Sequence, residues 1–174
     1  MNNADGFRGW DLFLSSGKPT VHVIDQWTEK ALKVTAKEAL KPGRWHHVMA
    51  VFDGTLKGAD AIAIFVNGRK VEVEINSNNL GPNIVSDVPL RLGGRSNNGK
   101  AAELITGGKV FIQDLRMYEK ALTPLQVAQV AITGLVREYQ GNIAGSDASH
   151  ASPLRTLSEY LAQLVSRSAS ISLR

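Results

Sequence analysis

One stretch of sequence decides the fold class: residues 61–75, which read AIAIFVNGRKVEVEI. An Asn-Gly pair between two β-like runs is the strongest short-range signal for a β-hairpin, because both residues tolerate the positive φ angles of a type I′ turn. We therefore predict two antiparallel strands, at 61–66 and 70–75, that are joined by the turn residues Asn67 and Gly68.

The sequence on both sides of this hairpin predicts more short strands. The run from Trp45 to Phe52 is almost continuously apolar, which is typical of a central strand that is buried on both faces. Other apolar or alternating runs end at glycine, proline, asparagine or aspartate, which are turn residues. Together these runs predict strands at 10–15, 20–24, 31–36, 45–52, 89–92 and 109–118.

The periodicity changes after residue 123. Thr123 can cap a helix that has Pro124 at its first position and that runs to about Tyr139. Residues 141–152 are small and polar and predict a linker, and residues 153–166 form a second amphipathic helix with leucines on one face. We therefore expect an all-β antiparallel sandwich with a closing helix over residues 1–140, a linker over 141–152, and a C-terminal helical segment over 153–174.

Composition limits the function. The chain has 174 residues, no cysteine and a net charge of +4, and 43% of its residues are hydrophobic. A disulfide framework and a thiolate metal site are therefore excluded. Basic residues are scattered rather than clustered, so we predict no nucleic-acid partner. No apolar stretch is long enough to span a membrane. The N-terminus lacks the pattern of a signal peptide, so we expect a piece of a larger protein.

Four segments, in this order, resemble laminin G-like and pentraxin-like domains of the concanavalin A-like lectin/glucanase superfamily. They are Gly43-Arg44-Trp45-His46-His47-Val48 with Asp53-Gly54, Phe65-Val66-Asn67-Gly68, Leu90–Gly94, and Gly107–Leu122 with its Ile112-Gln113-Asp114-Leu115-Arg116-Met117-Tyr118 core. The resemblance covers roughly residues 7–130 and implies a jelly-roll sandwich in which Trp45, Asn67, Gly68 and Asp114 are structural residues.

The first part of the chain, residues 6–43, resembles the version of this domain that occurs in large secreted bacterial proteins of the Planctomycete cytochrome C type. This implies a periplasmic or extracellular accessory module. Family members begin with one or two further strands that have no counterpart here. We therefore expect an open sheet edge, which would allow strand exchange between copies.

The resemblance, together with the loops, suggests where a ligand binds. We predict a non-catalytic module that binds a carbohydrate or a protein through Trp27 and the loop asparagines Asn79, Asn83, Asn97 and Asn98. Trp27 follows Asp25-Gln26 in a loop-like stretch and could stack on a sugar, although a tryptophan that lies in the core or covers it has the same signature.

Three other interpretations remain open. The leucine stripe of the second helix needs a partner, so the chain could instead be a structural or oligomerising domain with no ligand of its own. Family members often bind calcium, and Asp53 and Asp60 are the candidate ligands, but asparagine outnumbers aspartate in these loops and a low carboxylate count weakens calcium binding. Glu72 and Glu74 are spaced like carboxylates of a glycosidase strand, but they fit the solvated face of a hairpin better.

Overall fold

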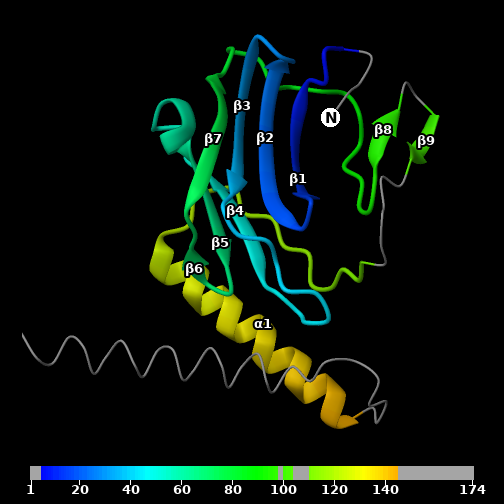
Figure 1. The fold of residues 1–174 in the computed structure, drawn as a ribbon. Helices are drawn as coiled ribbons and strands as arrows, with labels where there is room; N and C mark the ends of the chain where they lie inside the picture. The colour runs from blue at the N-terminus through cyan, green and yellow to red at the C-terminus, as the bar shows by residue number, and fades with distance from the viewer. Residues whose placement is uncertain (1–4, 98–99, 104–109, 145–174) are drawn as a thin grey trace, which may run out of the picture.

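The described part of the chain forms two stacked antiparallel sheets, a separate two-stranded sheet, and an α-helix beneath the stacked sheets (Figure 1). The structure is a computed structural model, and it describes residues 5–97, 100–103 and 110–144. The antiparallel sandwich with a C-terminal helix confirms the fold class that the alternating segments predict.

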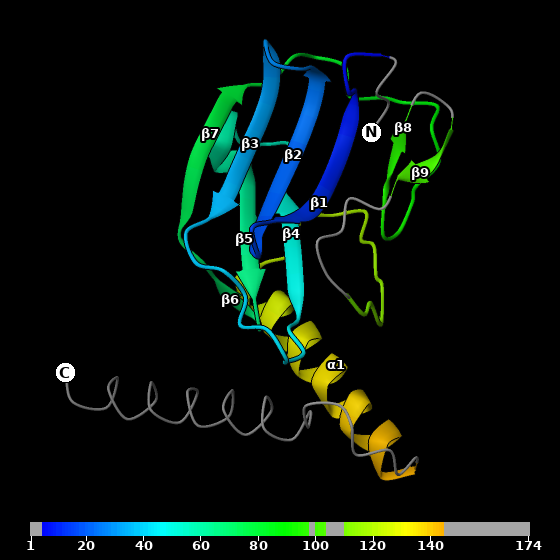
Figure 2. The same ribbon diagram turned by 45° about the vertical axis from the view of Figure 1, so that its right-hand side comes forward.

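The larger sheet has four strands in the order β1-β2-β3-β7, which are Gly9–Ser15, Lys18–Gln26, Lys30–Ala36 and Val73–Asn79. All neighbours are antiparallel. β1 lies at one edge of this sheet and β7 at the other, as both ribbon views show (Figures 1 and 2).

The smaller sheet contains the predicted hairpin. β4 (Val48–Phe52), β5 (Ile62–Val66) and β6 (Arg69–Lys70) pair in that order, and a short 3-10 helix (Gly58–Ala61) precedes β5. Asn67 and Gly68 join β5 to β6 with φ angles of 50° and 76°. These are the left-handed angles that a type I′ turn requires at both central positions, so the prediction of the turn is confirmed.

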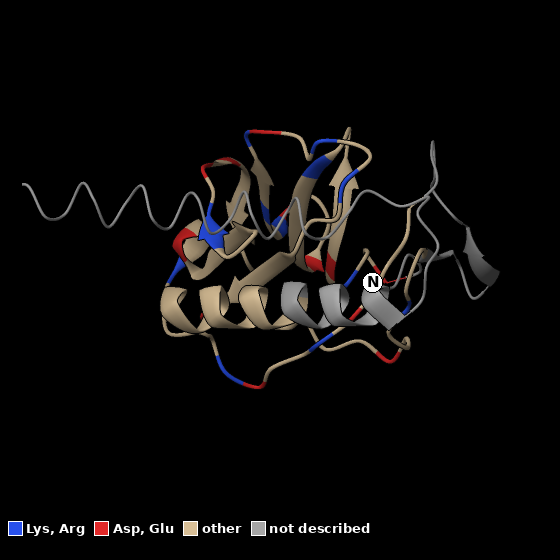
Figure 3. Cartoon of the chain, turned by 90° about the horizontal axis from the view of Figure 1, so that it is seen from below, with Lys and Arg blue, Asp and Glu red and all other residues tan. Residues whose placement is uncertain are grey.

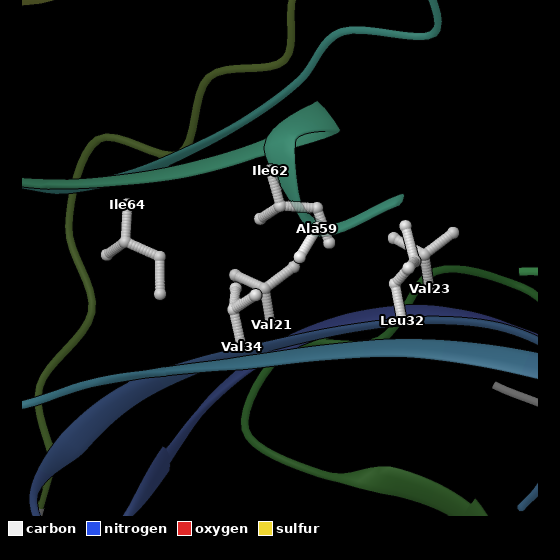
Figure 4. Close-up of a cluster of buried hydrophobic side chains, with 7 residues drawn as sticks. All are labelled: Val21, Val23, Leu32, Val34, Ala59, Ile62 and Ile64. Carbon is white, nitrogen blue, oxygen red and sulfur yellow. The ribbon is translucent and has the colours of Figure 1, made fainter. Parts of the chain in front are cut away.

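The core lies between the two sheets (Figure 4). Side chains of the larger sheet meet side chains of β5 and of the 3-10 helix there. Leu32, Val34 and Ile64 are at most 1% exposed, and full burial of a side chain of this size contributes about 1.5–3 kcal/mol. The cluster is completed by Val21, Val23, Ala59 and Ile62.

The run after the hairpin turn divides between the sheets. β6 ends at Lys70 and pairs with β5, whereas β7 begins at Val73 and pairs with β3 in the other sheet. The prediction of a single strand over 70–75 is therefore wrong. Glu72 lies at the crossover and Glu74 in β7, so they are not two residues of one strand.

The strand predicted at 45–52 is shorter than expected. β4 begins at Val48, and half-buried Trp45 precedes it. Among the described residues β4 pairs on one side only, so it is an edge strand and not the central strand that the apolar run predicted. An apolar run indicates that a segment is buried. Burial alone does not mean that the strand pairs with a neighbour on each side.

Two further predictions differ from the structure. Residues 89–92 are not a strand. The described part of the predicted strand at 109–118 is also not a strand: Asp114 adopts a φ of 54°, which interrupts an extended backbone. Asp114 instead pairs with Arg116 at 2.6 Å, within the segment itself. A small hairpin of β8 (Arg95–Asn97) and β9 (Lys100–Glu103) lies in the region where a loop was expected.

The predicted helix cap is confirmed. The Gln126 amide accepts a 2.9 Å hydrogen bond from the Thr123 backbone N–H, and the Thr123 hydroxyl accepts one of 3.3 Å from the Gln126 N–H, which is a capping box. Val127 and Ala131 of α1 (Pro124–Ala144) are fully buried.

Viewed from below, the first part of α1 carries no Lys, Arg, Asp or Glu side chain (Figure 3). The helix continues past Tyr139 into the range expected to be a linker. The predicted helix at 153–166 lies outside the described residues. Within the described part of the chain, no helix has both the length and the apolar character needed to cross a membrane.

Candidate functional site

A row of polar side chains crosses the outer face of the four-stranded sheet. Asp11, His22 and Lys33 lie directly opposite one another on β1, β2 and β3, and Ser77 of β7 completes the row. Directly opposed residues of an antiparallel sheet point to the same face. Because Val21 and Val23 point into the core and β-strand side chains alternate, His22 and its row point outward.

Trp27 folds back over this row from the turn between β2 and β3. Its ring centroid lies 5.3 Å from that of His22, and the Lys33 Nζ lies 5.9 Å from the Trp27 ring. An ammonium group at this distance from an indole face makes a cation–π interaction. The Trp27 backbone N–H donates a 2.8 Å hydrogen bond to the Gly6 carbonyl, which fixes the turn against the N-terminal segment.

His22 is held firmly in place under Trp27. Its Nδ1 lies 3.1 Å from the Asp11 carboxylate, and its ring packs against Phe13 at a centroid distance of 4.9 Å. His22 is only 6% exposed, whereas Trp27 is 37% exposed. The result is a rigid base with an accessible aromatic ring above it.

Two of the predicted loop asparagines lie at the same end of the sheet as Trp27. The Asn79 amide donates a 2.7 Å hydrogen bond to the Glu29 carbonyl, in the turn that contains Trp27. The Asn83 carbonyl accepts a 3.1 Å bond from Arg8, and Arg8 also pairs at 2.8 Å with the buried Asp25 at the end of β2. The sequence placed both asparagines in one loop. The structure instead places Asn79 at the end of β7, so the prediction of a loop residue is wrong for Asn79, whereas Asn83 lies in the loop that follows this strand.

The loop of Asn83 is packed closely on Asp25. A Cβ atom added at Gly81 would collide with the Asp25 carboxylate. This loop, the N-terminal segment and the β2–β3 turn are therefore tied together by Arg8, Asp25 and Gly81.

The remaining predicted residues do not join this cluster. Asn97 lies in β8, and Asn98 lies outside the described residues. The Asp53 carboxylate accepts two bonds from Thr55, from the backbone N–H at 3.0 Å and from the hydroxyl at 2.6 Å, and these bonds lower the pKa of Asp53. Asp53 therefore stabilises its own turn. Asp60 lies in the following 3-10 helix, and in the portion of the chain that is described no three metal-binding side chains converge.

Sequence reasoning singled out Trp27 as a candidate and did not single out the side chains that pack beneath it. Alternation alone places His22 on the face opposite Val21 and Val23, so this signal was present. The sequence carries no comparable signal for the register that aligns His22 with Asp11 and Lys33. This register depends on pairing between strands, which the local sequence does not specify.

Comparison with known protein families assigns the chain to a family. Residues 2–128 match the family model described as the concanavalin A-like lectin/glucanases superfamily, of the laminin G type, and the chain belongs to this family. The family includes carbohydrate- or protein-binding modules, and its description also names glucanases.

Among solved structures, the chain is similar to an S-layer domain-containing protein (residues 221–444) from Clostridium thermocellum ATCC 27405. It has 19% sequence identity and a TM-score of 0.39. The match covers 75% of this chain and 59% of that chain. Comparison with curated proteins gives no match.

Proposed function

We propose that the chain is a non-catalytic module that binds a carbohydrate at the Trp27 site, which we define as Trp27, His22, Asp11, Lys33 and Asn79. The observation that carries the proposal is the accessible Trp27 ring above a polar row on a rigid sheet. A sugar ring presents an apolar C–H face and a rim of hydroxyls. An aromatic platform bordered by charged and amide groups is complementary to both.

The supporting geometry is preorganised, which lowers the cost of binding. His22 and Asp11 are already paired, and Asn79 already holds the turn of Trp27. Few side chains need to be ordered when a ligand arrives, apart from Lys33, whose ammonium group can move from the ring to a sugar hydroxyl.

The binding test is a glycan array followed by calorimetric titration of the best ligand. Trp27→Ala removes the platform, and we expect binding to weaken by roughly 30-fold, which corresponds to a loss of about 2 kcal/mol for a central aromatic contact. Phe52→Ala is the matched control, because Phe52 is similarly exposed, at 39%, but lies in the other sheet. Absence of any glycan ligand, or equal binding by the Trp27 variant, would contradict the proposal.

The pairing of Glu72 with Lys37 does not fit the general acid of a glycosidase. Glu72 accepts a 2.9 Å bond from Lys37, which lowers the pKa of Glu72. A glycosidase acid needs the opposite shift, because it must stay protonated to donate its proton. Hydrolysis of a β-glucan that is abolished by Glu74→Gln would overturn this part of the proposal.

We also propose a location outside the cytoplasm, as an accessory part of a larger protein. The support is family membership, since domains of the laminin G type are typically extracellular. The gene that encodes the protein shows directly which domains flank this one, and whether they are of the Planctomycete cytochrome C type.

A further inference from the structure

The core-side face of β1 is uncovered. Leu12 lies directly opposite Val21, which belongs to the core cluster, so Leu12 points to the core side of the sheet. Strand side chains alternate between the two faces, so Trp10 and Leu14 point the same way. Trp10, Leu12 and Leu14 are nevertheless 45%, 40% and 44% exposed. We call these three side chains the open face of β1.

The face is open because the smaller sheet is narrower than the larger one. Among the described residues the smaller sheet has three strands and the larger sheet has four. The cluster of buried core residues takes side chains from β2, β3, β5 and the 3-10 helix, and none from β1. The segment that leads to β8 and the β8–β9 hairpin lie beside the free edge of β1 in both ribbon views (Figures 1 and 2). The uncovered part of β1 is therefore its face and not its edge.

A second apolar segment lies below the open face. Residues 110–118 pass between the lower end of β1 and α1 in both ribbon views (Figures 1 and 2). Four apolar side chains of this segment are between 55% and 62% exposed, namely Val110, Ile112, Leu115 and Met117. Large apolar side chains that are exposed in the same region indicate a surface that another segment or molecule covers.

The chain contains a segment that needs such a surface. Residues 153–166 lie outside the described residues, and their sequence predicts an amphipathic helix. The apolar stripe of this helix consists of Leu154, Leu157, Leu161, Leu164 and Val165. Arg155 and Glu159 lie outside the stripe. A helix can cover the face of a sheet through side chains alone, so it requires no free hydrogen-bonding edge.

We propose that residues 153–166 pack as a helix on the open face of β1, with the leucine stripe against Trp10, Leu12 and Leu14. The lengths of the two elements agree. A helix over 153–166 is about 21 Å long, and a strand of the length of β1 is about 23 Å long. Both apolar surfaces would then be buried by one contact.

The tether favours this segment over a second copy of the chain. α1 ends at Ala144, and both ribbon views place that end below the side of the sandwich that carries β1 and β8 (Figures 1 and 2). Residues 145–152 can span up to about 28 Å, which allows the chain to turn back towards β1. A short tether also holds the segment at an effective concentration on the order of 1 mM.

The first test is the accessibility of Trp10 in the full chain, measured as broadening of its indole N–H resonance by a soluble paramagnetic chelate. We expect protection in the wild type and loss of protection in Leu161→Lys, because the lysine places an ammonium group within the stripe. Gln163→Lys is the matched control, since it adds the same charge outside the stripe and should keep Trp10 protected. Trp27 is 37% exposed, so its resonance should broaden in all three proteins. Circular dichroism checks that both variants are folded.

The second test does not depend on a lysine in the stripe. The chain has no cysteine, so two introduced thiols can be joined selectively by a short bismaleimide. Leu12→Cys combined with Leu161→Cys should give an intramolecular cross-link in dilute protein, because both residues lie near the middle of their apolar surfaces. Leu12→Cys combined with Gln163→Cys is the control and should cross-link far less.

Four results would overturn the proposal: a wild-type Trp10 resonance that the chelate broadens, protection that survives Leu161→Lys, no cross-link between positions 12 and 161, or equal cross-linking from positions 161 and 163. Protection that is lost on dilution, with a molar mass that rises with concentration, would assign the cover to a second copy instead. Loss of glycan binding in Trp27→Ala leaves all these outcomes unchanged, so the two proposals fail separately.

Discussion

At the scale of single residues, the buried carboxylate of Asp25 holds the N-terminal segment against β2 through its pair with Arg8. Its side chain is 9% exposed and pairs with Arg8, which in turn holds the carbonyl of Asn83. Removing one partner of such a pair leaves a buried charge without compensation, and that penalty exceeds the net contribution of the pair itself.

We therefore expect Arg8→Ala to lower the free energy of unfolding by about 1–3 kcal/mol, as for a buried group that loses its partner. Urea denaturation measures this change. Lys37→Ala is the control, because its partner Glu72 is solvent-exposed and surface pairs contribute little. Equal stability of the wild type and the Arg8 variant would contradict this account.

His47 makes stability depend on pH. Burial lowers the pKa of His47 below its ordinary value of 6.5, and the nearby Arg116 lowers the pKa further, whereas Asp114 opposes this. The folded state then binds a proton less readily than the unfolded state. Stability is therefore full above pH 6.5 and falls as the pH drops below that value.

The test is the urea midpoint at pH 7.5 and at pH 5. We expect the midpoint to fall on acidification, and to fall less in His47→Gln, which does not titrate. If the two proteins lose the same amount, His47 is not the cause.

At the scale of elements, the hairpin turn is the part of the fold that the sequence specifies most locally. Asn67 exchanges two hydrogen bonds with His47: its N–H donates to the His47 carbonyl at 2.8 Å, and its side-chain oxygen accepts from the His47 N–H at 3.0 Å. The turn therefore also fixes the segment that enters β4.

Gly68→Ala tests this turn. With φ at 76°, an added Cβ is strained whatever space surrounds it, and we expect a loss of about 1–2 kcal/mol. Chemical denaturation is the measurement, and Gly54→Ala, at a glycine without positive φ, is the control. A variant as stable as the wild type would show that the turn does not require glycine.

The parts of the fold that the sequence predicts correctly are those that depend on residues close together in the chain. The turn, the helix cap at Thr123 and the alternation of β1 to β3 depend on neighbouring residues, and these predictions are confirmed. The passage of the chain from β6 to β7 is not readable, because Val71 and Val73 look like one strand whichever sheet they join. The segment at 109–118 has strand-like alternation, but the backbone of Asp114 interrupts it.

The candidate site divides in the same way. Trp27 could be picked out because an aromatic residue in a loop is conspicuous. The row beneath it depends on the register of three strands, and the link from Asn83 to Asp25 depends on Arg8, which lies 75 residues away from Asn83 in the chain. Distant contacts of this kind leave no pattern in one sequence.

At the scale of the whole molecule, the two faces of the larger sheet have different roles. One face packs on β5 to form the core, and the other carries the Trp27 site.

The proposal of a carbohydrate site is tested most directly by the indole N–H resonances in a nuclear magnetic resonance titration of the chain with its best glycan. The chain has 3 tryptophans, so each gives one separate signal: Trp10 from the core side of β1, Trp45 from the segment before β4, and Trp27 from the site. We predict that Trp27 shifts on binding while the other two stay in place. A glycan that shifts Trp10 or Trp45 and leaves Trp27 unmoved would contradict the account.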